Sequence, residues 1–213
     1  DGFPSTDPAP PLTALPATRQ EAERVAGTLH AAPERLLLGP QASEHNLRAL
    51  GPSAGLLHFA THAVLNPARP LDSYLALRPG GSEPEDDGRL TVGELHTLEL
   101  PADLVFLSAC RTAAGRLSAD GLLGLTRAFL FAGARSVVAT LWDIPDQPSA
   151  RLVEGFYARL PRGADRAAAL RAAQLGLLRE LRAGHVQVET VAGRVTLPED
   201  PALWAAFVLI GEP

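Results

Sequence analysis

The chain has 213 residues, of which 46% are hydrophobic and 20% charged, and its formal net charge is −5. This composition excludes collagenous, coiled-coil and wholly disordered chains. No apolar run approaches the roughly 18 residues that a membrane-spanning helix needs, and no basic, aromatic-interleaved patch indicates nucleic-acid binding. We therefore expect a cytoplasmic protein with no membrane or nucleic-acid partner.

The N-terminal stretch is rich in proline, with five prolines in the first sixteen residues. Proline fixes φ and lacks an amide donor, so we predict an extended arm or linker over residues 1–18 and one domain over residues 19–213. The chain has no methionine at all. We therefore expect that some N-terminal part of the natural protein precedes this sequence.

The first half of the domain alternates predicted helices with short apolar strands. Helix-forming residues and apolar spacing predict the helices, and Ser43 is a suitable N-cap for the second of them. A Gly-Pro pair ends the first strand. The expected elements are a helix over 19–30, a strand over 35–38, a helix over 43–50 and strands over 56–61 and 74–77.

Two predicted strands of the second half, Leu104–Cys110 and Ser136–Trp142, are apolar at both odd and even positions. Strands of this kind belong inside a mostly parallel sheet that is covered on both faces. The other expected elements are helices over 91–98, 121–131, 148–157 and 165–182, a hairpin over 186–197 and a closing strand over 204–210. This order predicts an α/β fold with a central mainly parallel sheet flanked by helices.

Two residues with catalytic chemistry follow predicted strands. His62 stands at the end of one strand and Cys110 at the end of another, where open α/β sheets bind their ligands. A thiol next to an imidazole can act as a nucleophile, with the imidazole handling the protons. The alternative is that the chain's single cysteine is a small buried hydrophobic residue. One cysteine also excludes an internal disulfide and a Cys-rich zinc site.

Several ordered sequence blocks carry a family resemblance. They are His58-Phe59-Ala60-Thr61-His62-Ala63, Asp103 to Thr112 with the core LVFLSACRT, Asp120 to Leu125, Gly133 to Trp142 and Trp204 to Gly211. Together they resemble the CHAT family, caspase-like domains found with tetratricopeptide repeats. The resemblance covers residues 19 to 212.

The resemblance implies a caspase-like three-layer fold and a cysteine endopeptidase that needs no metal or organic cofactor. It makes His62 and Cys110 the catalytic dyad, with the backbone amides of Ala63 and Cys110 as donors to the oxyanion. Members of the family usually have glycine after this histidine, whereas this chain has Ala63. The implied partners are a protein substrate and an upstream repeat domain or regulatory protein.

Other candidate sites are weaker. His58 and His62 form an H-x-x-x-H pair but lack the glutamate of the helical zinc motif, so we expect His58 to be a packed core residue. The chain has no lysine, which excludes the usual phosphate-binding P-loop. The remaining histidines, at positions 30, 45, 96 and 185, are expected to face solvent.

Two acidic residues, Asp143 and Asp146, follow the strand after the cysteine strand. In the caspase-like arrangement this loop borders the specificity pocket, so carboxylates there would favour cleavage after a basic residue. Alternatively, one of them caps the following helix. The main hypothesis for the chain is thus a gated cysteine endopeptidase, and the rival hypothesis is a weakly active or inactive module that binds a partner protein in signalling.

Overall fold

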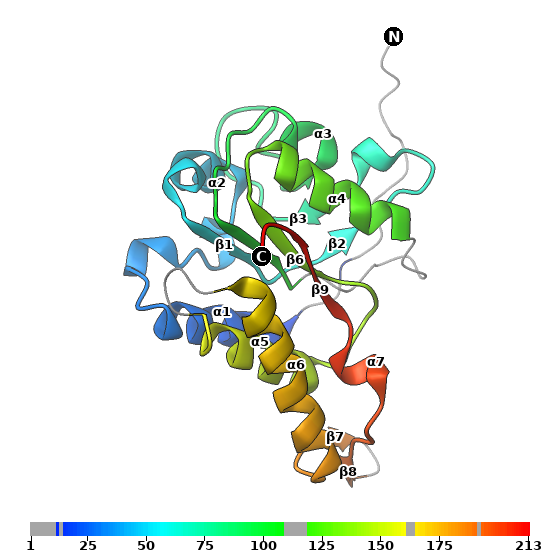
Figure 1. Cartoon of the computed structure of the whole chain (residues 1–213). Coiled ribbons are helices and arrows are strands. Elements are labelled where there is room, and N and C mark those ends of the chain that lie inside the picture. The colour runs from blue at the N-terminus through cyan, green and yellow to red at the C-terminus, as the bar shows by residue number, and fades with distance from the viewer. Residues whose placement is uncertain (1–11, 13–14, 109–118, 161–164, 191–192) are drawn as a thin grey trace.

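The central sheet has four strands in the order β1-β5-β6-β9 (Figure 1). A computed structural model describes residues 12, 15–108, 119–160, 165–190 and 193–213. The strands are β1 (Leu56–Phe59), β5 (Leu104–Leu107), β6 (Ser136–Thr140) and β9 (Phe207–Gly211). The first three run parallel and β9 runs antiparallel to β6. The predicted α/β class with a mainly parallel sheet is confirmed.

Both faces of the sheet are buried, because alternate side chains of each inner strand point to opposite sides. In β5, Val105 and Leu107 enter one core while Leu104 and Phe106 enter the other. All four are at most 2% exposed. A strand that is apolar on both faces therefore marks an inner position in this sheet, as the sequence predicted.

Helices cover both faces, which gives three layers (Figure 1). One face packs against α2 (Glu44–Leu50), α3 (Val92–Leu95) and α4 (Ala119–Phe131), and we call this side the α2–α4 core. The other face packs against α1 (Pro16–Thr28), α5 (Asp146–Tyr157), α6 (Arg166–Arg182) and α7 (Pro201–Trp204), here the α5–α6 core. In the described part of the chain, no helix has both the length and the hydropathy to cross a bilayer.

Two smaller sheets flank the central one. The first is antiparallel and contains β2 (Ala63–Val64), β3 (Tyr74–Ala76) and β4 (Arg89–Thr91). The second is the predicted hairpin, β7 (Gln187–Thr190) and β8 (Gly193–Thr196), which projects beyond α6 (Figure 1). β2 and β4 were missed from the sequence, because two or three residues are too short to show a period.

Several boundaries differ from the prediction, as four examples show. Helix α1 begins at Pro16 rather than residue 19, β1 ends two residues early, and α5 begins at Asp146, two residues before Pro148. Trp204 belongs to α7, whose N-cap Asp200 accepts a hydrogen bond from the Ala202 amide over 2.9 Å. The division between an arm over 1–18 and a domain over 19–213 stays a prediction.

The predicted strand over 35–38 was wrong. Pro33–Arg35 forms a 3-10 helix, and the extended residues Leu36–Leu38 that follow pair with no strand of the described chain. An apolar run becomes a strand only when another strand bonds to it.

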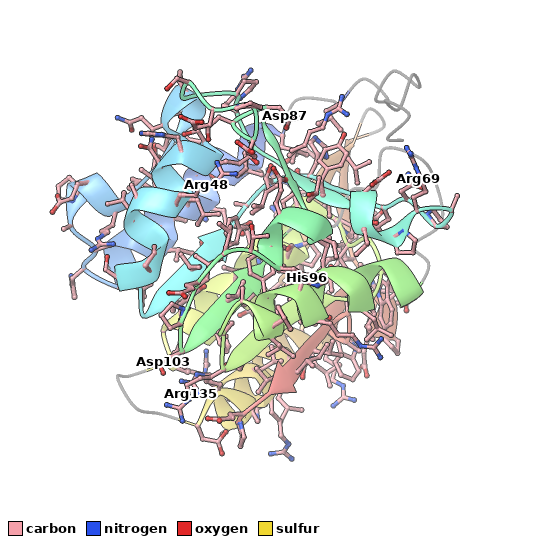
Figure 2. All side chains as sticks on the ribbon, turned by 90° about the horizontal axis from the view of Figure 1, so that it is seen from above. Arg48, Arg69, Asp87, His96, Asp103 and Arg135 are labelled. Carbon is pink, nitrogen blue, oxygen red and sulfur yellow. The ribbon has the colours of Figure 1, made fainter. Side chains whose placement is uncertain are left out.

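At the edge of the sheet where the parallel strands begin, an exposed cluster of ion pairs connects the residues that precede β5 and β6. Arg135 lies 3.4 Å from Asp103 and also pairs with Glu212 (Figure 2). Exposed pairs of this kind contribute little to the free energy of unfolding, about 0–1 kcal/mol each. The sheet is therefore held mainly by its two apolar cores.

Candidate functional site

The candidate site lies at the edge of the sheet where the three parallel strands end. There the Ser108 amide, directly after β5, donates to the Phe59 carbonyl at the end of β1 over 2.9 Å. The loops that leave this edge carry, in sequence, His62 after β1, Cys110 after β5 and Asp143 after β6. The topology thus brings the predicted site segments to one edge of the sheet.

His62 occupies the tight connection between β1 and β2 and is 7% exposed. Its carbonyl accepts a hydrogen bond from the Ala76 amide over 2.8 Å. The preceding hydroxyl, that of Thr61, donates to the Ala76 carbonyl. Strand β3 therefore fixes the backbone on both sides of the histidine.

Ala63 presents its amide away from its partner strand. It lies opposite Leu75, and the bond from the Ala76 amide to the His62 carbonyl makes this a non-hydrogen-bonded pair of the antiparallel ladder. In such a pair neither amide points to the other strand. The β2–β3 ladder therefore does not use the Ala63 amide, and its role as a donor to the oxyanion stays a prediction.

Cys110 lies outside the described residues, as does most of the segment after it. The nearest described residue is Ser108, two positions earlier. The His62–Cys110 dyad and the role of the Cys110 amide therefore stay predictions.

Asp143 lies on the loop from β6 to α5, Asp146 is the first residue of α5, and both are exposed. The N-cap of α5 is Pro145, which makes no side-chain capping bond, so neither acid is the predicted cap. Asp146 is the first residue of the helix, where a negative charge is favoured. The Trp142 indole fastens this loop by donating to the Ala202 carbonyl over 2.8 Å. Substrate contact by the two acids stays a prediction.

His58 is a packed core histidine, as predicted, and points to the α5–α6 core. Its Nδ1 lies 3.0 Å from the Tyr157 hydroxyl and its Nε2 lies 3.0 Å from Glu21 Oε1. Burial raises the pKa of the Tyr157 hydroxyl, and the charge of Glu21 adds to this effect. His58 therefore ties α1 and α5 to β1. Among the described residues, no group of three or more His, Cys, Asp or Glu is arranged to hold a metal.

A second set of polar groups lies largely buried between α2 and a loop. We call it the α2–loop cluster, and it consists of Glu44, Arg48, Asp86 and the Gly88 amide. Arg48 is labelled in Figure 2. Glu44 Oε2 accepts from that amide over 2.7 Å, and Arg48 pairs with Asp86 at 2.6 Å. Burial raises the pKa of Glu44 to about 7. The charges of Glu94 and Asp87 also raise it, whereas the Gly88 hydrogen bond and the Arg48 charge lower it. The cluster fastens the loop over residues 79–88 to α2.

Sequence reasoning missed the residues that position the site. Thr61 and Ala76 hold the histidine turn, and Ser108 joins the strand ends. A polar side chain directly before the histidine was a usable signal for Thr61. Ala76 and Ser108 act through backbone atoms, so the identity of their side chains does not reveal these contacts.

The comparisons with known proteins place this fold in a family. The model of the CHAT domain family matches residues 5–212, nearly the whole chain. The chain therefore belongs to the CHAT domain family, a family of caspase-like domains. The three-layer α/β arrangement agrees with this assignment.

Two curated relatives carry the same region. Tetratricopeptide repeat protein 28 of Mus musculus is 31% identical over 227 aligned residues, and the protein of the same name in Homo sapiens is 29% identical over 227. Each alignment covers 92% of this chain and 8% of the relative. The chain thus corresponds to a small part of two much longer repeat proteins.

Proposed function

We propose that this domain is a cysteine endopeptidase that cleaves protein substrates with His62 and Cys110. The observation that carries the proposal is the shared edge of β1 and β5, where the Ser108–Phe59 hydrogen bond brings together the segments that lead to the two residues. Membership of a caspase-like family agrees with this chemistry. The hydrogen bond from the Thr61 hydroxyl to the Ala76 carbonyl and the bond from the Ala76 amide to the His62 carbonyl supply the rigidity that a catalytic histidine needs.

In the proposed reaction the Cys110 thiolate attacks the scissile carbonyl carbon. The carbonyl oxygen becomes an oxyanion and accepts hydrogen bonds from the amides of Cys110 and Ala63. His62 then gives the thiol's proton to the leaving amine, which leaves a thioester on the cysteine. Water, deprotonated by His62, hydrolyses the thioester and restores the thiol. The dyad needs no metal or organic cofactor for these steps.

Asp143 and Asp146 are the proposed source of specificity for a basic residue before the cut. Asp143 lies on the loop that follows β6, and Asp146 begins the helix to which that loop leads. Cleavage of a library of peptides by the full-length protein tests the proposal, because Asp143→Asn and Asp146→Asn should reduce the preference for arginine and lysine. An unchanged preference in both variants would remove this assignment.

The activity is proposed to be gated by a neighbouring domain or partner. This chain covers 8% of two relatives named for tetratricopeptide repeats, and repeat arrays offer extended surfaces for partner binding. A gate needs only a few kcal/mol of differential contact to shift the populations of two loop conformations, here the loops over 113–119 and 143–147. The first of these loops lies largely outside the described residues. Equal cleavage rates for the fragment and for the full-length protein, with or without partner, would exclude the gate.

The decisive experiment compares Cys110→Ala and His62→Ala with His185→Ala, an exposed histidine far along the chain. Both dyad variants should lose cleavage of a peptide library while keeping the circular dichroism spectrum of the parent, and His185→Ala should cleave normally. Cleavage by the Cys110→Ala protein at the parent rate would overturn the proposal.

The rival function is a protein-binding module with little or no activity. It is favoured by the low exposure of His62, 7%, and by relatives whose names describe repeats rather than a peptidase. Iodoacetamide labelling distinguishes the two functions, since an activated Cys110 reacts rapidly near neutral pH and a buried inert thiol does not. His62→Ala should slow the labelling only if the imidazole activates the thiol.

A further inference from the structure

The loop between β3 and β4, over residues 79–88, is held on α2 by polar contacts. The Gly88 amide donates to Glu44 Oε2 over 2.7 Å, and Arg48 donates to Asp86 Oδ1 over 2.6 Å and to the Glu85 carbonyl over 3.4 Å. Apart from two prolines, the loop has no aliphatic or aromatic side chain, and residues 81–85 are exposed. Apolar burial therefore contributes little to its position, and the α2–loop cluster decides whether the loop stays on the helix.

Two carboxylate oxygens of this cluster are buried without a hydrogen-bond partner among the described residues, Glu44 Oε1 and Asp86 Oδ2. The two side chains are 1% and 2% exposed. Arg48 Nη2 lies 3.9 Å from Glu44 Oε1, beyond hydrogen-bonding distance. An ionised carboxylate in this position loses hydration that the protein replaces only in part, so burial favours the protonated form.

The charges around Glu44 are mostly negative. The charged and titratable groups that face Glu44 or its neighbour Asp86 are Arg48 and His45 of α2, Asp86 and Asp87 of the loop, and Glu94 of α3. Burial and the charges of Glu94 and Asp87 together raise the pKa of Glu44 to about 7, against the lowering effects of the Gly88 hydrogen bond and of Arg48. One arginine thus faces four carboxyl groups.

Two glycines allow the loop to fit closely against the cluster. A Cβ at Gly81 would lie 1.7 Å from Asp86 Oδ2, and a Cβ at Gly88 would lie 2.8 Å from Pro79 Cδ. Both glycines have positive φ, +126° and +88°. Large changes of backbone dihedral angle are typically absorbed at a few loop positions of this kind. The loop therefore has one closely packed position and two points at which its backbone can turn.

The end of this loop adjoins the bond that fixes the histidine turn. The Leu77 amide donates to the Gly88 carbonyl over 2.9 Å and extends the β3–β4 ladder by one bond. The preceding residue, Ala76, donates its amide to the His62 carbonyl. Movement of Gly88 away from Glu44 would break the Leu77 bond and expose the adjacent Ala76–His62 bond to water.

We propose that the α2–loop cluster is a pH-operated latch, in which protonated Glu44 keeps the loop over residues 79–88 on α2 and ionised Glu44 allows the loop to move away. The open loop also loosens the Ala76–His62 bond, so the latch controls the mobility of the histidine turn. This inference concerns the position of the loop and does not depend on the proposed chemistry of Cys110.

The direction of the pH effect follows from the two states of the latch. In the open state Glu44 is hydrated and its pKa returns to the ordinary value of 4.5, whereas in the closed state it is about 7. The closed state therefore holds a proton that the open state releases. Its advantage is complete below pH 4.5 and is lost as the pH rises through about 7.

Amide hydrogen exchange read by NMR on the 213-residue chain measures the open population. The reporters are the amides of Leu77 and of Arg78, which donates to the Ala42 carbonyl over 2.8 Å. Their exchange rates are compared with those of an unstructured peptide at the same pH, which removes the intrinsic pH dependence of exchange. The resulting protection should fall about tenfold between pH 6 and pH 8, and the Ala76 amide should follow it.

A low concentration of urea separates the latch from unfolding of the whole chain. A local opening exposes little surface, so urea should leave the exchange of Leu77 and Arg78 unchanged. The amide of Val138, in the central strand β6, should lose protection in urea because it exchanges only when the chain unfolds.

Three variants assign the titrating group. Glu44→Gln keeps an acceptor for the Gly88 amide but cannot ionise, so its loop protection should be equal at pH 6 and pH 8. Glu83→Gln, at an exposed acid of the same loop, is the matched control and should behave as the parent does. Histidine side chains change charge in this pH range, so His45→Asn is the second control and should keep the pH dependence of the parent.

Four results would overturn the proposal. The first is equal loop protection at pH 6 and pH 8 in the parent, and the second is a urea dependence of the loop amides that matches that of Val138. The third is a pH dependence that persists in Glu44→Gln and disappears in His45→Asn, which would assign it to the His45–Asp86 pair. The fourth is an Ala76 amide that stays protected while the loop opens, since the latch would then not reach the histidine turn. The parent alone decides the first, second and fourth results, even if Glu44→Gln does not fold.

Discussion

The two faces of the central sheet are packed with different side chains. On the α5–α6 side, Phe106 of β5 meets the rings of Phe156, Tyr157 and Phe207 at centroid distances of 5.3, 5.5 and 5.5 Å. The α2–α4 core contains one ring pair, Phe59 with Phe129, and is otherwise mainly Leu, Val and Ala. One face thus depends on a central aromatic residue, while the other distributes its contacts over many small ones.

A contrast also holds between two buried polar networks, one on each face, although the buried indole nitrogen of Trp204 on the α5–α6 side also lacks a hydrogen-bond partner among the described residues. In the α5–α6 core, both ring nitrogens of His58 have partners. On the other face, Glu44 Oε1 and Asp86 Oδ2 are buried and find no hydrogen-bond partner among the described residues. A buried polar group stabilises a fold only when it is fully satisfied, so the two networks should respond in opposite ways to neutralising substitutions.

The largest expected effect is the loss of Phe106. Phe106→Ala should lower the free energy of unfolding by about 3–5 kcal/mol, because it removes a fully buried ring and leaves a cavity among three others. Leu90→Ala, at a fully buried position of the α2–α4 core, should cost about 2–5 kcal/mol, since its neighbours can close in more easily. Urea titration measures both values. A larger loss for Leu90→Ala would contradict the comparison.

Removal of His58 should rank second. His58→Ala leaves the Tyr157 hydroxyl and the Glu21 carboxylate without their partner, and each stranded group costs about 1–3 kcal/mol. Thermal unfolding should show a clear loss of stability, whereas the exposed control His185→Ala should unfold at the parent temperature. If the two variants unfold alike, His58 does not tie α1 and α5 to β1.

Neutralising Glu44 should change the pH dependence of stability. Its pKa in the folded protein is about 7 against an ordinary value of 4.5, so the folded state holds a proton that the unfolded chain releases. The contribution of this group is complete below pH 4.5 and is lost as the pH rises through about 7. Glu44→Gln keeps an acceptor for the Gly88 amide and stays neutral.

We therefore expect Glu44→Gln to be more stable than the parent at pH 8, by up to about 3 kcal/mol, and similar to it at pH 4.5. Denaturant midpoints across this range measure the difference between the two proteins. A difference that does not grow with pH would show that Glu44 is ionised without cost in the folded chain.

The smallest expected effect is at the N-terminus of α3. The Thr91 hydroxyl accepts from the Glu94 amide over 3.1 Å, and Glu94 Oε2 accepts from the Thr91 amide over 2.8 Å. Thr91→Ala should cost about 0.5–2 kcal/mol, while Thr91→Ser keeps the capping oxygen and should cost little. Equal chemical-denaturation midpoints for the two variants would show that the cap contributes nothing.

Strand positions in the central sheet were largely predictable, because Leu104–Leu107 and Ser136–Thr140 are apolar on both faces and only a covered sheet buries both. The N-cap Ser43 was equally predictable, and its hydroxyl accepts a hydrogen bond from the Asn46 amide in the first turn of α2. The strand over 35–38 was not, because whether an apolar run pairs depends on a partner far away in the chain.

The residue types of the candidate site were predictable from the sequence, but the hydrogen bonds that hold them in place were less so. His62 follows a strand as expected, and β5, the strand that precedes Cys110 in the sequence, ends beside the end of β1. The bonds to Ala76 involve backbone atoms of a strand whose register the sequence does not reveal. The burial of Glu44 was also hidden, since an acid in the first turn of a helix usually faces solvent.

The closing strand β9 affects how the chain acquires its structure during synthesis. β9 pairs Phe207 with Thr140 and Gly211 with Ser136, so it joins strands whose paired residues lie 67 and 75 positions apart in the sequence. Until residues 207–211 leave the ribosome, β6 has an open edge and Phe106 lacks the ring of Phe207. Contacts this distant in the sequence slow folding and leave apolar surface exposed. A ribosome-bound chain that stops before Phe207 should therefore be a substrate for chaperones.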